Sequence, residues 1–423
     1  MPEAPEIALP QKKLRKTRAL PADVLVLFFI WPLGAFIHAI RNYRAAWTPR
    51  LFVYFSVFLG FTFVLFGDAE RVALHLEYMH SEPVTLHLLF EEYWADDTGV
   101  LDIFYRLVTF VVAFFTSDHR FLNAVLAGLM GYFIARSVWF LLQQTDHKLG
   151  TFDGLILIAL ALTVQLWYIG GRWNLAAIVF AYGVLRYFYS REIRFLFLAA
   201  LSVLIHWTFF FSLPVLVAYA LLGNRSLLFY LIFVTSFFFA FVEIETIRSL
   251  FDTYAPTPVL ETRSSYLHEG VIEERELRAE RVRWYIQGHN NLLRAFILVA
   301  VSFLFFFKKN TIRKSQPVYN LFNFSLLFFG IFNSISYVPS VGRFLVAGQW
   351  FFLAVLFLFI HETKGRFHPF IRMAGYVVLL VFIVVRFRIG ADGIGLWTLA
   401  GNPFFVYFVE NDTALIDMVK AIF

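Results

Sequence analysis

Residues 343–361 read RFLVAGQWFFLAVLFLFIH, and this stretch decides the fold class. After the opening arginine it carries no lysine, arginine or acidic residue. A helix needs roughly 17–25 such apolar residues to cross a bilayer, and this run is long enough. Similar apolar runs recur along the whole chain. The sequence therefore predicts an all-α, polytopic transmembrane helical bundle with about 11–13 membrane segments.

The composition supports the same class. Of the 423 residues, 60% are hydrophobic and 16% are charged, whereas soluble chains carry roughly 25% charged residues. The net charge of +6 is typical of the cytoplasmic loops of a membrane protein, so no nucleic-acid partner is expected. The chain has no cysteine, which excludes disulfides and thiolate metal sites. We treat residues 1–423 as a single transmembrane domain.

Candidate membrane segments follow from the apolar runs. They lie at residues 22–40, 50–67, 99–116, 121–143, 152–169, 173–190, 194–223, 226–242, 290–307, 317–337, 343–361 and 371–387. Pro32-Leu33-Gly34 interrupts the first, which is either a full span or a re-entrant or interfacial helix. The stretch 194–223 is too long for one upright helix, and we expect a break near His206 or Pro214. We expect the aromatic tail 394–408 at the membrane interface.

The basic residues orient the chain. Three short basic stretches are expected on the cytoplasmic side: residues 190–194, 308–314 and 363–372. The stretch 68–98 holds eight acidic residues and one arginine, and like 243–290 it is expected outside. Because 68–98 and the first basic stretch are expected on opposite sides, an odd number of membrane segments must separate them. The number of candidate segments between them is even, so one segment before residue 190 must be partial. In the second half of the chain, the number of crossings agrees with the expected sides if 194–223 makes two passes.

Arg172 follows Gly170-Gly171 and is expected to open a membrane helix. A cation at a helix start opposes the helix dipole, so it does not serve helix stability. Together with free backbone N–H groups it makes an anion site. Gly183 lies about three turns on, on the same face, and would let a lipid chain or a helix approach. The alternative is an interfacial arginine that snorkels to the membrane surface.

Arg343 repeats this arrangement after Pro339-Ser340-Val341-Gly342. Two guanidinium groups at one face of the membrane can clamp a pyrophosphate through paired hydrogen bonds, which suits arginine better than lysine. We therefore predict that Arg172 and Arg343 bind the same pyrophosphate.

Two further side chains are candidates for proton transfer. His206 lies between Ile205 and Trp207 in an apolar run, where an imidazole is normally neutral and acts as a base or a hydrogen-bond donor. The alternative is a structural histidine at a helix break. Asp68 follows a predicted membrane segment and is either a general base or sugar ligand, or a solvated carboxylate.

More acidic residues lie near Asp68 in the sequence, at Asp96, Asp97 and Asp102. They show no ligand-like spacing with histidine or asparagine, so no metal is expected. Glycine-rich nucleotide loops and serine or cysteine nucleophile motifs are missing from the sequence. We therefore expect neither a cofactor nor a soluble nucleotide substrate.

The long external stretch 243–290 contains a predicted amphipathic helix at 271–286. Glu274 and Arg278 are spaced four residues apart, which supports a helix. This helix is either a solvated lid on the membrane or a cap over a substrate cavity. As a cap it would set acceptor choice, with sugar-binding aromatic residues at Tyr254, Tyr266, Trp284 and Tyr285.

At these motifs the chain resembles the EpsG family, a branch of the Wzy-like polysaccharide polymerases. Four places carry the resemblance: Gly67-Asp68-Ala69-Glu70-Arg71, Gly170-Gly171-Arg172-Trp173-Asn174, Leu204-Ile205-His206-Trp207-Thr208, and Pro339-Ser340-Val341-Gly342-Arg343. Arg172 and Gly183 also fit the Arg-x10-Gly spacing of Wzy proteins. Val72 departs from the family, in which a tyrosine often follows the first arginine. The resemblance spans residues of about 50–360.

The resemblance implies a membrane glycosyltransferase with a GT-C-like architecture in the inner membrane of a bacterium. It would polymerise oligosaccharide repeat units linked to undecaprenyl pyrophosphate into a surface or extracellular polysaccharide, such as O-antigen or exopolysaccharide. Arg71, Arg172 and Arg343 would bind the pyrophosphate, and Asp68 or His206 would accept a proton. The expected partners are the lipid-linked oligosaccharide, membrane lipids and other polysaccharide export proteins.

Two other functions fit parts of the sequence. A membrane-bound acyltransferase also buries a histidine among aromatic-rich helices, but it draws on a cytoplasmic acyl donor. A flippase or transporter of lipid-linked glycans would show a repeated half, and no repeat is evident in the sequence. The side of the membrane from which His206 is accessible separates the first alternative from a polymerase.

Overall fold

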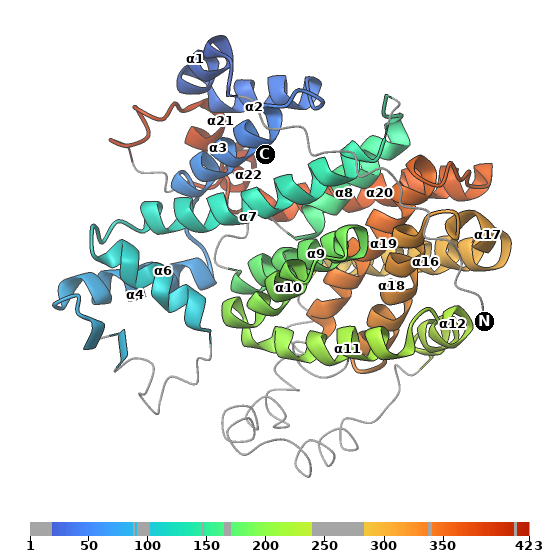
Figure 1. Cartoon of the computed structure of the whole chain (residues 1–423). Coiled ribbons are helices and arrows are strands. Elements are labelled where there is room, and N and C mark those ends of the chain that lie inside the picture. Colours follow the sequence, from blue (N-terminus) through green and yellow to red (C-terminus); the bar gives the residue numbers. More distant parts are fainter. Residues whose placement is uncertain are drawn as a thin grey trace.

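The computed structural model describes residues 19–87, 89–90, 102–145, 148–164, 171–238, 283–336, 341–409 and 413–422. Within these ranges the chain is built of helices (Figure 1). The helices are α1 (Ala22–Ile30), α2 (Pro32–Arg41), α3 (Thr48–Phe61), α4 (Asp68–Ser81), α6 (Ile103–Ala113), α7 (His119–Gln143), α8 (Thr151–Thr163), α9 (Arg172–Ser190), α10 (Arg194–Ile205), η1 (Trp207–Phe211), α11 (Ser212–Leu222), α12 (Ser226–Thr235), α16 (Trp284–Phe307), α17 (Lys309–Ile312), α18 (Gln316–Ser334), η3 (Val341–Arg343), α19 (Phe344–His361), α20 (Pro369–Gly390), α21 (Leu396–Ala400) and α22 (Leu415–Ile422).

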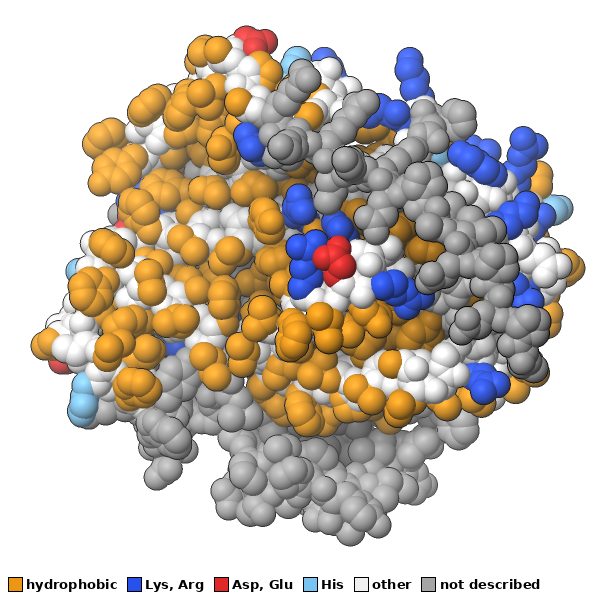
Figure 2. Space-filling view, viewed as in Figure 1, with side chains coloured by type: hydrophobic (Ala, Val, Ile, Leu, Met, Phe, Trp, Pro, Cys, Tyr) orange, Lys and Arg blue, Asp and Glu red, His pale blue; other side chains and the backbone are white. Residues whose placement is uncertain are grey.

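Four of these helical stretches are long and apolar enough to cross a membrane: His119–Gln143, Trp284–Phe307, Val341–His361 and Pro369–Gly390. Shorter apolar helices accompany them, and the chain is a multi-pass membrane protein. The stretch from which the fold was predicted forms α19, whose apolar residues are almost all buried inside the bundle. Figure 2 shows the reverse on the outside, where hydrophobic side chains cover the left half of the view and a band below its centre. Such a surface suits contact with lipid.

The three basic stretches meet at one end of the bundle, which we call the basic end. Both the Tyr189 hydroxyl, at the end of α9, and the Ser315 hydroxyl, before α18, donate hydrogen bonds to the Glu362 carboxylate after α19. Burial raises the pKa of Glu362, although the two hydroxyl donors oppose that shift. In Figure 1 this end lies at the right, where α17 is seen. The three stretches therefore lie at the same end of the bundle, as expected, and the cytoplasmic location of this end stays a prediction.

At the opposite end of the bundle, which we call the site end, aromatic side chains from several helices pack together. Trp173 at the start of α9 and Phe344 at the start of α19 have ring centroids 5.9 Å apart. Phe209 of η1 contacts both rings, at 5.4 Å and 5.2 Å. The starts of α9 and α19 and the break between α10 and α11 therefore lie together.

The helix break expected in 194–223 occurs at His206. α10 ends at Ile205, and His206 has an extended backbone with φ −149° and ψ 111°. α11 then returns to the basic end, where the Tyr219 hydroxyl donates to Asn224 Oδ1 and the Asn224 amide donates to Asn320 of α18. The stretch therefore runs from the basic end to the site end and back, and two membrane passes stay a prediction. Pro214 does not cause the break, because it lies in the first turn of α11, where proline is tolerated.

The shortest helix in the four candidate segments between 68–98 and the first basic stretch is α6. This helix has 11 residues and rises roughly 16 Å, about half of a hydrocarbon core. It packs with α4 and contacts the start of α7, and α4 and α6 lie together at the left of Figure 1. With α6 taken as the partial segment, α7, α8 and α9 separate 68–98 from the first basic stretch, and this odd number is the one that the orientation requires; the assignment stays a prediction.

The first predicted segment is two short helices. α1 has nine residues and α2 has ten, and the chain turns between them at Trp31 before Pro32. Neither is long enough to span a bilayer. The structure therefore shows no single full span here, and the re-entrant or interfacial alternative stays the prediction for α1 and α2.

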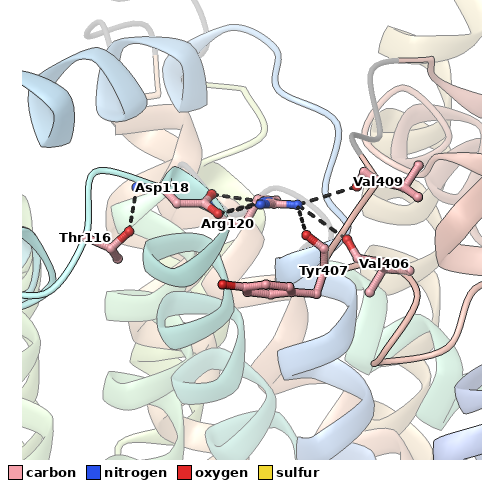
Figure 3. Close-up of polar contacts among 6 residues, drawn as sticks. All are labelled: Thr116, Asp118, Arg120, Val406, Tyr407 and Val409. Atoms are coloured by element: carbon pink, nitrogen blue, oxygen red, sulfur yellow. Dashed lines mark hydrogen bonds and ion pairs between the residues drawn. The ribbon is translucent and has the colours of Figure 1, made fainter.

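The aromatic tail packs back on the site end. The Trp31 indole donates to the carbonyl oxygen of Leu399 at 2.7 Å. Arg120, at the start of α7, donates to the carbonyl oxygens of Val406, Tyr407 and Val409 at 3.3–3.4 Å (Figure 3).

Asp118 fixes the Arg120 side chain through hydrogen bonds of 2.8 Å and 3.0 Å to Nε. Burial alone would raise the pKa of Asp118, but the hydrogen bonds from Arg120 outweigh it and lower the pKa. Arg120, held by Asp118, therefore connects the start of α7 to the backbone carbonyl oxygens of the tail (Figure 3).

Candidate functional site

Arg172 is the first residue of α9, and an acidic side chain from another helix holds it. Its Nη1 lies 3.0 Å from Oδ2 of Asp102, the residue before α6. The Asp102 side chain is 5% exposed and the Arg172 side chain 36%. The guanidinium also lies over the Tyr105 ring, 5.2 Å from its centroid. Arg172 is therefore positioned by a buried carboxylate while its outer part remains accessible.

Asp102 also holds the helix break beside His206. Its Oδ1 accepts a hydrogen bond from the backbone N–H of Trp207 at 2.9 Å. One buried carboxylate thus joins the start of α9 to the break between α10 and η1. The sequence interpretation grouped Asp102 with the acids near Asp68 and missed this pairing. The signal that could have found it is an acid directly before an apolar helix, since such a residue seldom stays buried without a cation.

A small cavity lies beneath Arg172. Its volume of about 10 Å³ holds no more than about one water molecule. It is lined by Phe104, Tyr105, Leu126, Ala127, Met130, Gly171, Arg172, Leu175 and Ile205. A sugar does not fit there, so a glycan could meet Arg172 only from its exposed side.

Arg343 lies at the same end of the bundle. It closes η3 and precedes Phe344, and its side chain is exposed. Since Phe344 and Trp173 pack together, the two arginine-bearing helix starts are neighbours. Arg343 has no ion pair within the ranges that the structure describes. The shared pyrophosphate stays a prediction.

His206 forms a local pair with Thr208. Its Nδ1 lies 2.8 Å from the Thr208 hydroxyl and accepts weakly from the Thr208 N–H at 3.4 Å. The hydroxyl alone is compatible with either neutral tautomer, whereas the contact from the Thr208 N–H requires an unprotonated Nδ1. If Nδ1 carries the proton and donates it to the Thr208 hydroxyl, the N–H contact is lost and the Nε2 lone pair can act as a base. If Nδ1 accepts, Nε2 carries the proton and is a donor.

Asp68 and Arg71 belong to α4, which packs on α6 rather than against α9. The His80 ring near the end of α4 bonds to the carbonyl oxygen of Ala113 at the end of α6. Gly67 precedes α4 with φ +58°, a conformation that favours glycine. The Arg71 side chain is exposed, and the Asp68 side chain lies outside the description. α4 is thus connected to the Arg172 site through α6.

Trp284 and Tyr285 open α16 at the site end. Trp284 is 82% exposed and Tyr285 is half-buried. Most of the predicted helix at 271–286 lies outside the described residues. So do Asp96, Asp97, Tyr254 and Tyr266. In the ranges that are described, no three acidic or histidine side chains are grouped as metal ligands.

Asp102→Asn tests the buried pair. Asparagine keeps the shape and can still accept from Trp207, but it loses the charge that faces Arg172. We expect the free energy of unfolding to fall by about 1–3 kcal/mol, toward the lower value because Arg172 is partly exposed. Thermal unfolding of the purified chain measures this. Asp417→Asn removes an exposed partner of Lys420 and should change nothing, so equal losses in both variants would contradict the assignment.

Comparison with known proteins adds one finding. The model of the EpsG family matches residues 76–400. No curated protein and no solved structure matches the chain. Arg172, His206, Trp284, Tyr285 and Arg343 lie inside the matched region. Asp68 and Arg71 precede it.

Proposed function

Since the chain belongs to the EpsG family, a family of Wzy-like polysaccharide polymerases, we propose that it joins lipid-linked oligosaccharides into a polymer. The donor is a growing glycan on undecaprenyl pyrophosphate, and the acceptor is another lipid-linked repeat unit. The acceptor hydroxyl oxygen attacks the anomeric carbon of the donor. The bond from that carbon to the pyrophosphate breaks, the pyrophosphate leaves with the electron pair, and the hydroxyl proton passes to a base.

One observation carries this proposal. Asp102 pairs with Arg172 at 3.0 Å and accepts from the Trp207 N–H at 2.9 Å. A guanidinium and the segment that contains His206 are thereby fixed to one another. A cation beside a group that can exchange a proton is what departure of a pyrophosphate and activation of a hydroxyl require.

Arg172 and Arg343 are proposed to stabilise the charge that develops on the leaving pyrophosphate. Guanidinium groups bind such oxygens through two parallel hydrogen bonds. The Asp102 carboxylate engages Nη1 of Arg172, and arginine has five N–H donors in all, so donors remain for an anion. Arg71, exposed on α4, is a further proposed contact for the lipid-linked substrate.

His206 or Asp68 is proposed as the base. His206 is favoured by its direct chain connection to Trp207, whose N–H is bound to the carboxylate that holds Arg172. Asp68 begins a helix that packs on α6 and α7 and not directly on Arg172, and Asp68 itself precedes the residues that match the family. The rate of polymer formation in His206→Gln and in Asp68→Asn decides which of the two residues is the base.

The site end is proposed to face the outside of the inner membrane. Support comes from the basic end, which carries the stretches expected in the cytoplasm. The chain has no cysteine, so His206→Cys introduces a single thiol. We expect it to react with a membrane-impermeant thiol reagent added from outside. Labelling from the cytoplasm alone would reject this topology and favour an acyltransferase.

Trp284 and Tyr285 are proposed to contact the acceptor sugar. Their alanine variants should weaken acceptor use by about 1–3 kcal/mol, taking stacking on nucleic-acid bases as the guide. The measurement is the KM for the acceptor. Tyr407→Ala removes another exposed aromatic residue of the site end and serves as control. An unchanged KM in both first variants would remove these residues from the binding site.

The experiment that tests the function compares cells with and without this protein. Lipid-linked intermediates are extracted and separated by length. A polymerase predicts that single repeat units accumulate outside and that long chains disappear. Loss of acylation with normal chain length would support the acyltransferase, and accumulation on the cytoplasmic face would support a flippase. Either result would overturn the proposal.

A further inference from the structure

A second group of polar side chains lies between α16 and α20 and takes no part in the site described above. Arg386 and His289 are only 4% and 3% exposed. Arg386 Nη2 donates to Asn290 Oδ1 at 3.2 Å, and its guanidinium lies over Phe382 at 5.0 Å. The His289 ring is 5.6 Å from the same Phe382 ring. We call Arg386, His289 and Asn290 the α16–α20 cluster, and we include Arg294 because it lies one turn beyond Asn290 on α16.

Several polar atoms of the α16–α20 cluster lack a partner. In the described part of the chain, Nε of Arg386, Nε of Arg294 and Nε2 of His289 are buried without a hydrogen bond. His289 Nδ1 donates to the Tyr285 carbonyl oxygen at 3.2 Å, so Nε2 of the neutral ring is an acceptor, and only the two arginines of the cluster can bind an anion. No acidic side chain within the same ranges pairs with either arginine. Buried cations are costly unless they are paired, so the guanidinium groups of Arg386 and Arg294 call for an anion.

The depth of the α16–α20 cluster indicates what kind of anion it takes. Asn290 follows the start of α16 at Trp284, and Arg386 precedes the end of α20 at Gly390, each by roughly one to two turns. Both helix termini lie at the site end. The cluster is therefore at the level where lipid headgroups meet the hydrocarbon core.

The flanks of the α16–α20 cluster are apolar and exposed. Leu292 and Val299 lie on the outer surface of α16, and Val377 and Val384 on that of α20, each 40–60% exposed. A ligand that satisfies buried cations here also meets a hydrophobic surface beside them. A free anion uses only the first feature, whereas a lipid phosphate uses both.

We propose that the α16–α20 cluster binds the phosphate headgroup of a polyprenyl carrier and holds the second of two lipid-linked substrates. The inference rests on the proposed function, because joining two lipid-linked chains requires two lipid phosphates at the same membrane face. Arg172 and Arg343 hold the phosphate that leaves. The α16–α20 cluster holds the phosphate that stays attached to its chain.

A photoreactive polyprenyl phosphate tests the site without any chemistry on sugars. The full chain is placed in nanodiscs of phosphatidylcholine, and crosslinked peptides from residues 284–307 and 369–390 are quantified against probe concentration. We expect half-saturation to shift about 10- to 100-fold upward in Arg386→Gln. Arg386→Lys keeps the charge without the planar fork and should show a smaller shift in the same direction.

Arg388→Gln is the matched control. It removes the same charge from the same helix two residues on, but Arg388 already pairs with Asp392 at 3.1 Å, so its half-saturation should equal that of the wild type. Equal crosslinking in the wild type and both Arg386 variants would overturn the inference. So would equal shifts in Arg386→Gln and Arg388→Gln.

Competitors identify the source of the anion. Phosphatidylglycerol that displaces the probe as well as unlabelled polyprenyl phosphate would make this a general site for anionic lipids and overturn the inference, as would displacement by millimolar inorganic phosphate. The experiment distinguishes failure of the proposed function from failure of the lipid site. Crosslinking as expected in a protein that forms no polymer would reject polymerisation and keep the lipid site. Unchanged crosslinking in the Arg386 variants of an active polymerase would reject only the lipid site.

Discussion

Arg172→Lys is expected to remove most polymer formation although it keeps the positive charge. Lysine can still pair with Asp102, but it lacks the planar fork that would hold two oxygens of a pyrophosphate. We expect turnover to fall by about 10²–10³-fold, as when one donor to a developing negative charge is lost. Arg343→Lys should behave alike. The measurement is polymer length and yield from purified lipid-linked repeat units.

A control variant and a double variant test this prediction further. Arg194→Lys changes an arginine of the basic end whose side chain is 70% exposed and pairs with Glu192, and it should leave turnover unchanged. Arg172→Ala together with Arg343→Ala should cost little more than either alone, because groups that act as a unit are not additive. Full activity in both lysine variants, or strictly additive losses, would leave two independent interfacial arginines.

Features governed by local composition were predictable from the sequence. The basic stretches were expected on one side, and the hydrogen bonds from Tyr189 and Ser315 to Glu362 bring them together. A break in 194–223 followed from its length, since the stretch exceeds one span, but length alone did not choose between His206 and Pro214. The locations of Arg172 and Arg343 at helix starts also followed from the glycine and proline residues before them.

Features that depend on contacts between distant residues were not predictable. Asp102 and Arg172 are 70 positions apart in the sequence, and nothing local pairs them. The segment 99–116 was apolar enough for a span, but helix α6 begins only at Ile103 and ends at Ala113. Arg386 and Arg294 lie inside predicted spans, and only the packing of α16 on α20 brings Arg386 to Asn290.

His206→Gln is expected to reduce turnover by about 10²–10⁴-fold if His206 is the base. Glutamine can donate a hydrogen bond from roughly the position of Nε2 but cannot accept a proton at neutral pH. The variant therefore separates a base from a donor. Polymer formation from purified repeat units is the measurement, and Gln349→Ala, in the buried α19, controls for altered packing.

Thr208→Val decides between the two tautomers that the His206–Thr208 contact allows. If the hydroxyl accepts from Nδ1, its loss frees that proton and weakens Nε2 as a base, so turnover should fall by about tenfold and the pH profile of kcat should shift. If His206 is only a donor through Nε2–H, the weak hydrogen bond from the Thr208 N–H persists and Thr208→Val should be nearly silent. Near-normal turnover in both His206→Gln and Thr208→Val would make His206 structural at the helix break. Proton transfer would then rest on Asp68, whose helix reaches the site through α6, and Asp68→Asn would have to show the loss that His206→Gln did not.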